Sequence, residues 1–285
     1  MAFDPNRIPD NLKAAYRDKR CAVLVGAGAS VGAGLPTWGK FLSDMIGVAE
    51  SHRVIGDHKA AEYRKLVSDP AKYLMIAASL KEDMSAYFDE FIDQTFMAPK
   101  PRPTDLHRSL TQADRLQFVL TTNYDIVIEQ AYRAAGMYDV SVCTFTDTGE
   151  VQRRLSKREF FILKAHGDAS RVGNGIILTE VDYRNIIYRH RAYQSLLSAM
   201  FTMFTIVFVG ASMTDPEIKL LLSYIADAFS PTSGPSHFAL MAEEDITNVE
   251  KDRWLRDMKV QLIPVSKANE YKEVTEFIRA IHDSA

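Results

Sequence analysis

The stretch 21–38 reads C-A-V-L-V-G-A-G-A-S-V-G-A-G-L-P-T-W, and the rest of the chain is organised around it. A short apolar run, residues 22–25, passes directly into a glycine-rich turn that contains Gly26, Gly28 and Ser30. This order is typical of a buried parallel strand that ends in a turn around a phosphate group. A helix that begins near Ser30 would direct its free N–H groups and its dipole at such an anion. The stretch predicts a nucleotide site, although an ordinary strand-to-helix turn has the same pattern.

The composition indicates a globular protein without a strong charge preference. Of the 285 residues, 47% are hydrophobic, which is enough to bury a large core. Lys and Arg total 34 against 37 Asp and Glu, and this balance gives no general reason to bind nucleic acid. The dense basic cluster within residues 153–158 fits a solvated surface better than a polyanion site. We therefore expect no sequence-specific contact with nucleic acid.

The same totals bear on location and on metals. No stretch approaches the roughly 18 apolar residues of a membrane span, and the N-terminal sequence lacks the apolar core of a signal peptide. We expect a cytoplasmic protein that makes no membrane contact. The two cysteines, Cys21 and Cys143, are too few for a disulfide framework or a four-thiolate zinc site. The seven histidines show no metal-ligand spacing, so we expect no metal.

A long helical segment separates the first two predicted strands. Residues 41–96 carry apolar side chains at helical spacing and show no strand signal. Such a run is too long for a simple crossover, so it predicts a helical layer or lid beside the sheet. We expect one domain over residues 1–285 with a helical insertion over residues 41–103.

Polar side chains follow several later apolar runs. The run 118–121 leads to Asn123 and Asp125, and the run 160–163 leads to His166 and Gly167. Asp125 fits a helix cap as well as a functional role, whereas Asn123 lies one position too early for a cap. A histidine between an apolar strand and a glycine favours function over a structural role. Residues 175–178 predict one more short strand.

The strand 206–209 runs into a second glycine-tipped turn, made of Gly210, Ala211 and Ser212. Asp215 follows as the predicted cap of a helix, with Pro216 in its first turn. Together with strands at 140–144, 238–241 and 260–265, the alternation predicts an α/β fold with a doubly wound, mostly parallel, Rossmann-like sheet. Parallel strands end at one edge, so these polar residues can line one crevice.

The order of the motifs resembles the NAD-binding domain of sirtuins. The resemblance rests on G-A-G-A-S with G-L-P-T-W at 34–38, on T-N-Y-D at 122–125, on H-G at 166–167 and on V-G-A-S at 209–212. Sirtuin deacylases carry a four-cysteine zinc module after the histidine motif, but no cysteine lies between His166 and Gly210 here. The family's aspartate or threonine followed by phenylalanine and arginine also reads T-W-G here. The pattern is more similar to the sirtuin-like NAD hydrolases of bacterial antiphage defence, which lack zinc and deplete NAD.

The resemblance implies an NAD+ glycohydrolase that releases nicotinamide and ADP-ribose, with His166 and Asn123 as catalytic residues. Cleaving the nicotinamide–ribose bond needs a sheltered pocket and a group that manages a proton near neutral pH, and histidine suits this task. We expect His166 to contact ribose hydroxyls or activate water, Asn123 to position water or ribose, and Asp125 to hold the nicotinamide amide. The expected NAD-binding residues are, for the pyrophosphate, Gly26, Ala27, Gly28 and Ser30; for the nicotinamide end, Thr37 and Trp38; and for the adenosine side, Gly210, Ala211 and Ser212.

Two other functions fit the same residues. An ADP-ribosyltransferase would use this pocket with a different nucleophile, and a regulatory or scaffold subunit would bind NAD or ADP-ribose without cleaving it. The short chain leaves little room for a separate sensor, so we expect activation by homo-oligomer assembly or by a partner. In related defence systems one such partner is a HerA-type ATPase.

Overall fold

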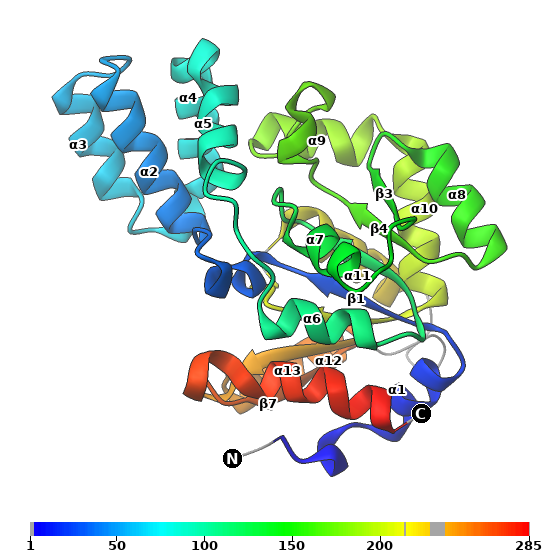
Figure 1. The fold of residues 1–285 in the computed structure, drawn as a ribbon. Coiled ribbons are helices and arrows are strands. Elements are labelled where there is room, and N and C mark those ends of the chain that lie inside the picture. Colours follow the sequence, from blue (N-terminus) through cyan, green and yellow to red (C-terminus); the bar gives the residue numbers. More distant parts are fainter. Residues whose placement is uncertain (1–2, 214, 229–236, 285) are drawn as a thin grey trace.

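A computed structural model describes residues 3–213, 215–228 and 237–284 of the chain. Its centre is a seven-stranded sheet with the order β3-β4-β2-β1-β5-β6-β7 (Figure 1). Each pair of neighbouring strands is parallel, which confirms the predicted α/β fold. The strands are β1 (Cys21–Val25), β2 (Leu116–Thr121), β3 (Ser141–Thr144), β4 (Phe161–Lys164), β5 (Thr205–Val209), β6 (His237–Ala242) and β7 (Val260–Val265).

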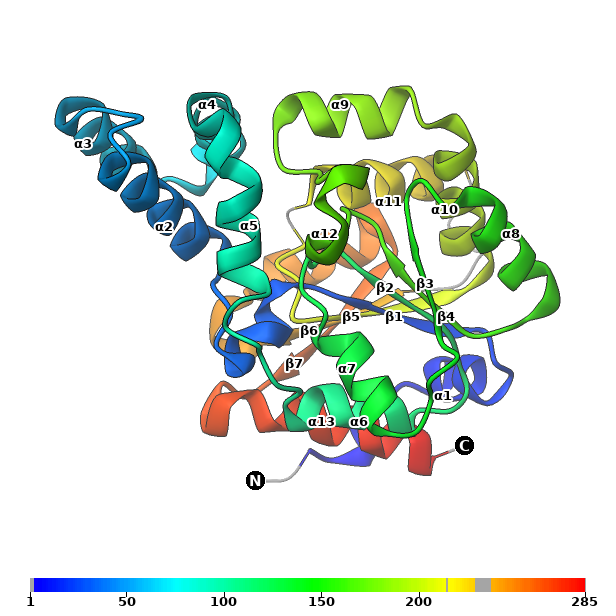
Figure 2. The same cartoon turned by 45° about the horizontal axis from the view of Figure 1, so that its top comes forward.

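Helices cover both faces of this sheet (Figure 2). One face packs on α1 (Asp10–Arg17), α6 (Asp105–Gln112), α7 (Val127–Ala134) and α13 (Ala268–Asp283). The other face packs on α8 (Thr148–Lys157), α9 (Glu180–Tyr188), α10 (Arg191–Met203), α11 (Pro216–Ala228) and α12 (Asn248–Met258). Alternate residues of one strand enter opposite cores, because successive side chains of a strand point to opposite faces. In β1, Ala22 and Leu24 enter one core, and Cys21, Val23 and Val25 enter the other.

Four further α-helices follow one another between β1 and β2, as the helical pattern of residues 41–96 predicts. They are α2 (Trp38–Ser51), α3 (Asp57–Leu66), α4 (Tyr73–Met84) and α5 (Phe88–Phe96), and they lie beside the sheet (Figure 1). Their apolar sides form a third core that also takes in Leu35 and Val127. The first of these helices begins at Trp38, three residues before the predicted boundary of the insertion.

The predicted strand at residues 175–178 is wrong, because this segment pairs with no strand of the described sheet. Its apolar side chains are buried for another reason. Ile177 joins the core between the sheet and the helices α8 to α12. Ile176 and Leu178 join the core of the helical layer made by α2 to α5. The segment thus bridges two cores, and this packing gives the same alternating pattern as a half-buried strand.

The basic cluster within residues 153–158 lies on the protein surface, as its charge pattern predicts. Arg153 and Arg154 form ion pairs with Glu150 of α8 and with Glu159 just after it, so these two arginines of the basic cluster are paired with their own neighbours. Among the described helices, none combines the length and the apolar character needed to cross a membrane.

Candidate functional site

Four strands end level with one another at one edge of the sheet. Thr121 of β2 pairs with Val25 of β1 and with Lys164 of β4, and Val25 pairs with Val209 of β5. The four loops that carry the sequence motifs therefore leave the sheet side by side. The strand order also reverses here, since β2 lies on one side of β1 and β5 on the other, and α/β sheets bind ligands at such a point.

The loop after β1 differs from the predicted strand-to-helix turn. It forms a 3-10 helix, Ala27–Ala33, and no α-helix begins near Ser30. Gly34, with φ of 85°, ends the turn in the left-handed region that favours glycine, and the next α-helix begins only at Trp38. An anion at this loop would therefore meet a short 3-10 turn in place of the predicted α-helix N-terminus.

The glycines of the β1 and β5 loops are required by the close approach of the two loops. The Gly26 and Gly28 N–H groups donate to the carbonyl oxygens of Val209 and Gly210, each at 2.9 Å. A Cβ on Gly210, where φ is 61°, would lie 2.4 Å from the backbone nitrogen of Ala29. Two of the N–H groups predicted to hold a pyrophosphate are thus already bonded within the protein.

The predicted binding residues divide into an exposed rim and a buried floor. Ala27, Gly28, Thr37 and Ser212 are exposed at the rim, whereas Ser30 is only 2% exposed. Gly26 is also buried, and Gly210 and Ala211 are half-buried. Trp38 packs its ring against Phe41 and Tyr73, with ring centroids 5.7 and 6.1 Å away, so its indole belongs to the helical layer.

Asn123 joins the β2 loop to the β1 loop. Its side chain is buried, and Nδ2 donates to the Gly26 carbonyl oxygen at 3.1 Å and to Ser30 Oγ at 3.2 Å. Its Oδ1 is buried and has no hydrogen-bond partner among the described residues. Since buried polar atoms are nearly always paired, this acceptor is open to a bound molecule.

Asp125 bonds the start of the following helix, although the N-cap position itself is the next residue, Ile126. Its Oδ1 accepts a hydrogen bond from the Val127 N–H at 2.9 Å, and the residue is 4% exposed. This bond satisfies a free N–H group at the start of α7. This bond gives the residue a structural role without a ligand, so its expected contact with the nicotinamide amide stays a prediction.

His166 lies on the buried floor and faces two carboxylates. Its Nε2 is 3.5 Å from Asp215 Oδ2 and 3.5 Å from Glu217 Oε2, and its ring packs edge-on against Tyr183. Burial lowers the pKa of the imidazole, but the two carboxylates outweigh burial and raise the pKa above its ordinary value. The two carboxylates stabilise the protonated ring, which suits a group that takes up a proton during a reaction.

Lys164, the last residue of β4, is a site residue to which the sequence pattern gave no role. Its side chain is fully buried, and Nζ donates to the Tyr124 and Asp125 carbonyl oxygens at 3.1 and 2.6 Å. Nζ also donates to Glu129 Oε1 at 2.9 Å and to Asp168 Oδ1 at 3.1 Å. One ammonium group thus joins the T-N-Y-D loop to the H-G-D loop.

The pKa values of both carboxylate partners of Lys164 differ from their ordinary values. Burial raises the pKa of Glu129, and Lys164 only partly opposes it. Burial also acts to raise the pKa of Asp168, but Lys164 and the hydrogen bonds from Ser170 outweigh burial, and the pKa lies below its usual value. An ionisable residue at the end of an otherwise apolar strand was the signal in the sequence that could have drawn attention to Lys164.

Asp215 and Glu217 were likewise not predicted as site residues. Asp215 caps α11 as expected, since its Oδ1 accepts from the Ile218 N–H at 3.0 Å. The structure adds that Asp215 Oδ2 accepts from the Tyr183 hydroxyl at 2.7 Å and faces His166. Their contact with His166 joins segments far apart in the sequence, and no local pattern reports it.

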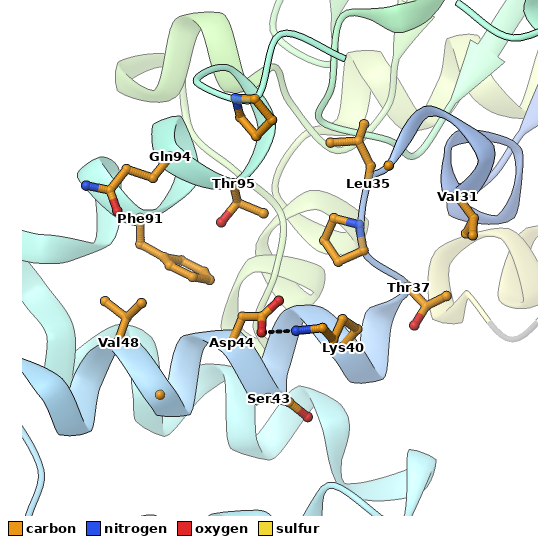
Figure 3. A pocket seen from close by; sticks show the side chains of 14 residues that line it. Val31, Leu35, Thr37, Lys40, Ser43, Asp44, Val48, Phe91, Gln94 and Thr95 are labelled. Carbon is orange, nitrogen blue, oxygen red and sulfur yellow. Dashed lines mark hydrogen bonds and ion pairs between the residues drawn. The ribbon is translucent and has the colours of Figure 1, made fainter. Parts of the chain in front are cut away.

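A cavity of about 820 Å³ lies next to the site, between the 31–37 segment, α2 and α5 (Figure 3). Thr37 lines it, together with Leu35, Lys40 and Phe91, but Asn123 and His166 do not. Lys40 is paired with Asp44 within the same wall (Figure 3). Among the predicted residues only Thr37 reaches this cavity, so it is separate from the Asn123 and His166 floor.

No group of three or more His, Cys, Asp or Glu side chains is placed to hold a metal ion within the described ranges 3–213, 215–228 and 237–284. Asn123 and His166 each lie two residues beyond paired strand ends, at Thr121 and Lys164. The structure therefore brings Asn123, Ser30 and Gly26 together directly, and it places His166 on the neighbouring loop.

Comparison with known proteins identifies a family whose model matches this chain. The family model described as "SIR2-like domain" matches residues 117–263, more than half of the chain. The chain is 26% identical to "Defense-associated sirtuin 2" of Bacillus subtilis over 73% of its own length and 19% of that protein. It is 24% identical to "NAD(+) hydrolase ThsA" of Bacillus cereus over 94% of its own length and 55% of that protein.

The chain thus spans 19% and 55% of the length of these two curated relatives. A solved structure, titled as the crystal structure of a Sir2 homolog–NAD complex, aligns with all of this chain and 96% of its own. That alignment has a TM-score of 0.45 and 13% sequence identity.

Proposed function

Because the chain belongs to the SIR2-like domain family, we propose that it is an NAD+ glycohydrolase that releases nicotinamide and ADP-ribose. The observation that carries the proposal is the buried floor at the shared strand edge. There Asn123 Oδ1 is buried without a hydrogen-bond partner among the described residues, and His166 is buried on the neighbouring loop. Two relatives that the chain covers by 94% of its own length are named NAD(+) hydrolase, which supports the same reaction.

Cleavage replaces the bond from ribose to nicotinamide by a bond to water. The electron pair of the broken bond leaves with nicotinamide, and the proton that water gives up must go to a base. In the proposed mechanism His166 takes this proton and Asn123 positions the water or the ribose. Asp125 would hold the nicotinamide amide. Enclosure by the buried floor would shield the cationic sugar centre from nucleophiles other than the positioned water.

The remainder of NAD would extend from this floor to the rim. The pyrophosphate would lie on Ala27 and Gly28, next to Gly26 and Ser30, and the adenosine on Gly210, Ala211 and Ser212. Thr37 and Trp38 would flank the nicotinamide end at the start of α2. Because the Gly26 and Gly28 N–H groups already bond the β5 loop, a phosphate oxygen would have to share them or displace that loop.

NAD consumption is the direct test. Purified protein is incubated with NAD+, alone, at high concentration and with candidate partner proteins, and nicotinamide and ADP-ribose are separated and quantified. We expect His166→Ala and Asn123→Ala each to lower the rate at least about 10²-fold, because each removes a group that acts on the reacting atoms. His58→Ala is the matched control, since the side chain of His58 is 91% exposed.

The outcomes separate the possible functions. Intact NAD+ under every condition contradicts the proposal. Labelled ADP-ribose on a macromolecule indicates an ADP-ribosyltransferase, and tight binding without turnover indicates a regulatory subunit.

We further propose that the reaction depletes NAD+ in antiphage defence, and that self-assembly or a partner such as a HerA-type ATPase activates it. The name of the Bacillus subtilis relative, "Defense-associated sirtuin 2", supports the defence role. Loss of phage resistance in cells that carry His166→Ala, at unchanged protein level, is the expected result.

A further inference from the structure

His166 faces, at the same ring nitrogen, two carboxylates that follow a different strand. Asp215 and Glu217 follow β5, whereas His166 follows β4, and β2 and β1 lie between these strands. The contact therefore spans the middle of the strand edge. Glu217 is 1% exposed and His166 is 3% exposed, so this charge contact has almost no screening by solvent.

Other side chains fix both carboxylates in place. Asp215 accepts hydrogen bonds from the Tyr183 hydroxyl and the Ile218 N–H. Glu217 Oε1 accepts a hydrogen bond from Gln194 Nε2. Glu217 Oε2 is left facing His166 Nε2, and neither atom has a hydrogen-bond partner among the described residues. A buried carboxylate oxygen without a hydrogen-bond partner lowers the stability of the fold. Packing alone therefore does not explain a glutamate at position 217.

The geometry determines which ring nitrogen can serve as the base. A carboxylate at Nε2 favours the tautomer in which Nε2 carries the proton, and this leaves Nδ1 unprotonated. A base whose other nitrogen is oriented by a carboxylate is the arrangement on which acyl-transfer triads depend. The 3.5 Å separations are longer than good hydrogen bonds, and they would shorten when the ring becomes positively charged.

We propose that Glu217, assisted by Asp215, is a positioning residue that orients His166 and stabilises its protonated form during NAD cleavage. The inference rests on the proposed function. In the step that it describes, an O–H bond of water breaks, its proton moves to His166 Nδ1, and the oxygen bonds the ribose carbon that nicotinamide leaves. The imidazolium keeps its Nε2–H directed at Glu217, and the added proton later returns to solvent.

Titration of His166 by NMR tests the charge contact without any need for catalysis. The protein is labelled with ¹³C-histidine, and His166→Ala identifies the His166 signal among the seven histidines. The groups that face its ring are Asp215 and Glu217, which act on its charge, and Tyr183, which packs on it. We expect Glu217→Gln and Asp215→Asn each to lower the titration midpoint of His166 by about one pH unit or more.

Asp227→Asn is the matched control. Asp227 is exposed on the same helix, α11, so the variant makes the same kind of charge change away from the ring. Glu217→Gln keeps the shape of the side chain and the acceptor for Gln194, and Asp215→Asn keeps a good helix cap, which favours a native fold in both. An unchanged His166 midpoint in Glu217→Gln and Asp215→Asn overturns the inference.

Kinetics then separate orientation from a purely structural role. In Glu217→Gln we expect kcat for NAD cleavage to fall about 10- to 100-fold with little change in KM, because the residue acts on the base and not on NAD. The acidic limb of the kcat profile should move to lower pH, since the base loses its proton at lower pH. Unchanged kcat and acidic limb contradict the inference. NAD+ that stays intact with the wild-type protein, beside a shifted His166 midpoint, refutes the proposed function and leaves the charge contact established.

Discussion

At the scale of single residues, Lys164 shows how one buried charge can organise two functional loops. Its ammonium group bonds the backbone of Tyr124 and Asp125, which belongs to the loop that carries Asn123. It also bonds Asp168, two residues after His166. Burying an ion pair gains little stability over apolar residues of equal volume, but removing one partner leaves the other charge stranded. Lys164 therefore fixes the relative position of the two loops more than it adds net stability.

We expect Lys164→Met to lower the free energy of unfolding by about 3–5 kcal/mol, because Glu129 would remain buried without a cation and Asp168 would keep only its ion pair with the more exposed Arg171. Urea unfolding followed by circular dichroism measures the loss. Lys219→Met, at an exposed position of α11, is the control and should change stability by less than about 0.5 kcal/mol. The double variant Lys164→Met with Glu129→Gln should recover part of the loss, since it removes one stranded charge. Equal stability of Lys164→Met and Lys219→Met would contradict this view of the cluster.

At the scale of elements, the N-terminus of α6 is capped with the help of a histidine, at the position where a capping box usually has glutamate or glutamine. Thr104 precedes the helix, and its backbone N–H donates to His107 Nδ1 at 3.3 Å. A side chain at this third helical position that reaches back to the preceding N–H completes a capping box. His107 is fully buried, and burial lowers its pKa to about 4, with only partial opposition from the nearby charge of Asp125.

This cap makes stability depend on pH. In the unfolded chain a histidine gains its proton near pH 6.5, whereas folded His107 stays neutral until about pH 4. Between these values the unfolded state binds more protons, so the free energy of unfolding falls as the pH is lowered through this window. The contribution of His107 is fully present above pH 6.5, and about 3 kcal/mol of it is lost by pH 4.

The variant His107→Gln tests this dependence, because glutamine can keep the capping bond but does not titrate. We expect its free energy of unfolding to fall less steeply between pH 6.5 and 4.5 than that of the wild type, by up to about 1.4 kcal/mol per pH unit. Urea titrations at four pH values in this window measure the slope. His58→Gln, at an exposed position, should run parallel to the wild type. If the free energy of unfolding of His107→Gln has the same pH dependence as that of the wild type, the buried ring does not control acid stability.

At the scale of the whole molecule, local patterns predicted the strands and their ends, but not the contacts between distant loops. The apolar runs before Gly26, Asn123, His166 and Gly210 all became strands of one sheet, because burial and a turn signal are local properties of the sequence. The wrong strand at residues 175–178 has a tertiary cause, since two cores bury this segment without a strand. Contact between the β1 and β5 loops also requires glycine at positions predicted to bind phosphate, and the phosphate contact itself stays a prediction.

The same limit explains the missing site residues. Lys164 and Glu217 gain their roles from partners such as Glu129 and His166, which lie far away in the sequence. A charged residue at the end of an apolar run can mark a position, as at Lys164, but it does not identify the partners. Asp215 was predicted as a cap, and it is one, but its second oxygen faces a histidine 49 positions earlier, at residue 166. Sequence thus predicted the strands and their shared edge better than the contacts between side chains beyond that edge.

The division into an exposed rim and a buried floor is a property of the whole fold, and thiol chemistry can measure it. The native cysteines give a quiet background, because Cys21 and Cys143 are both buried and burial raises the pKa of the Cys21 thiol to about 12. A thiolate is the reactive form, so neither should react with a thiol reagent in the folded state. We expect Ala27→Cys, at the exposed rim, to react quickly.

In contrast, Asn123→Cys places a thiol on the floor, where the native side chain is 6% exposed, and we expect it to react at least about 10²-fold more slowly. Adding urea should bring the two rates together, which separates protection by the fold from differences in intrinsic thiol reactivity. Reaction of Asn123→Cys as fast as Ala27→Cys in the folded state would mean that the floor is open to solvent. Slow reaction would mean that the residues around Asn123 must move before a reagent reaches it, and NAD+ would need the same movement to reach a floor where Asn123 and His166 are both buried.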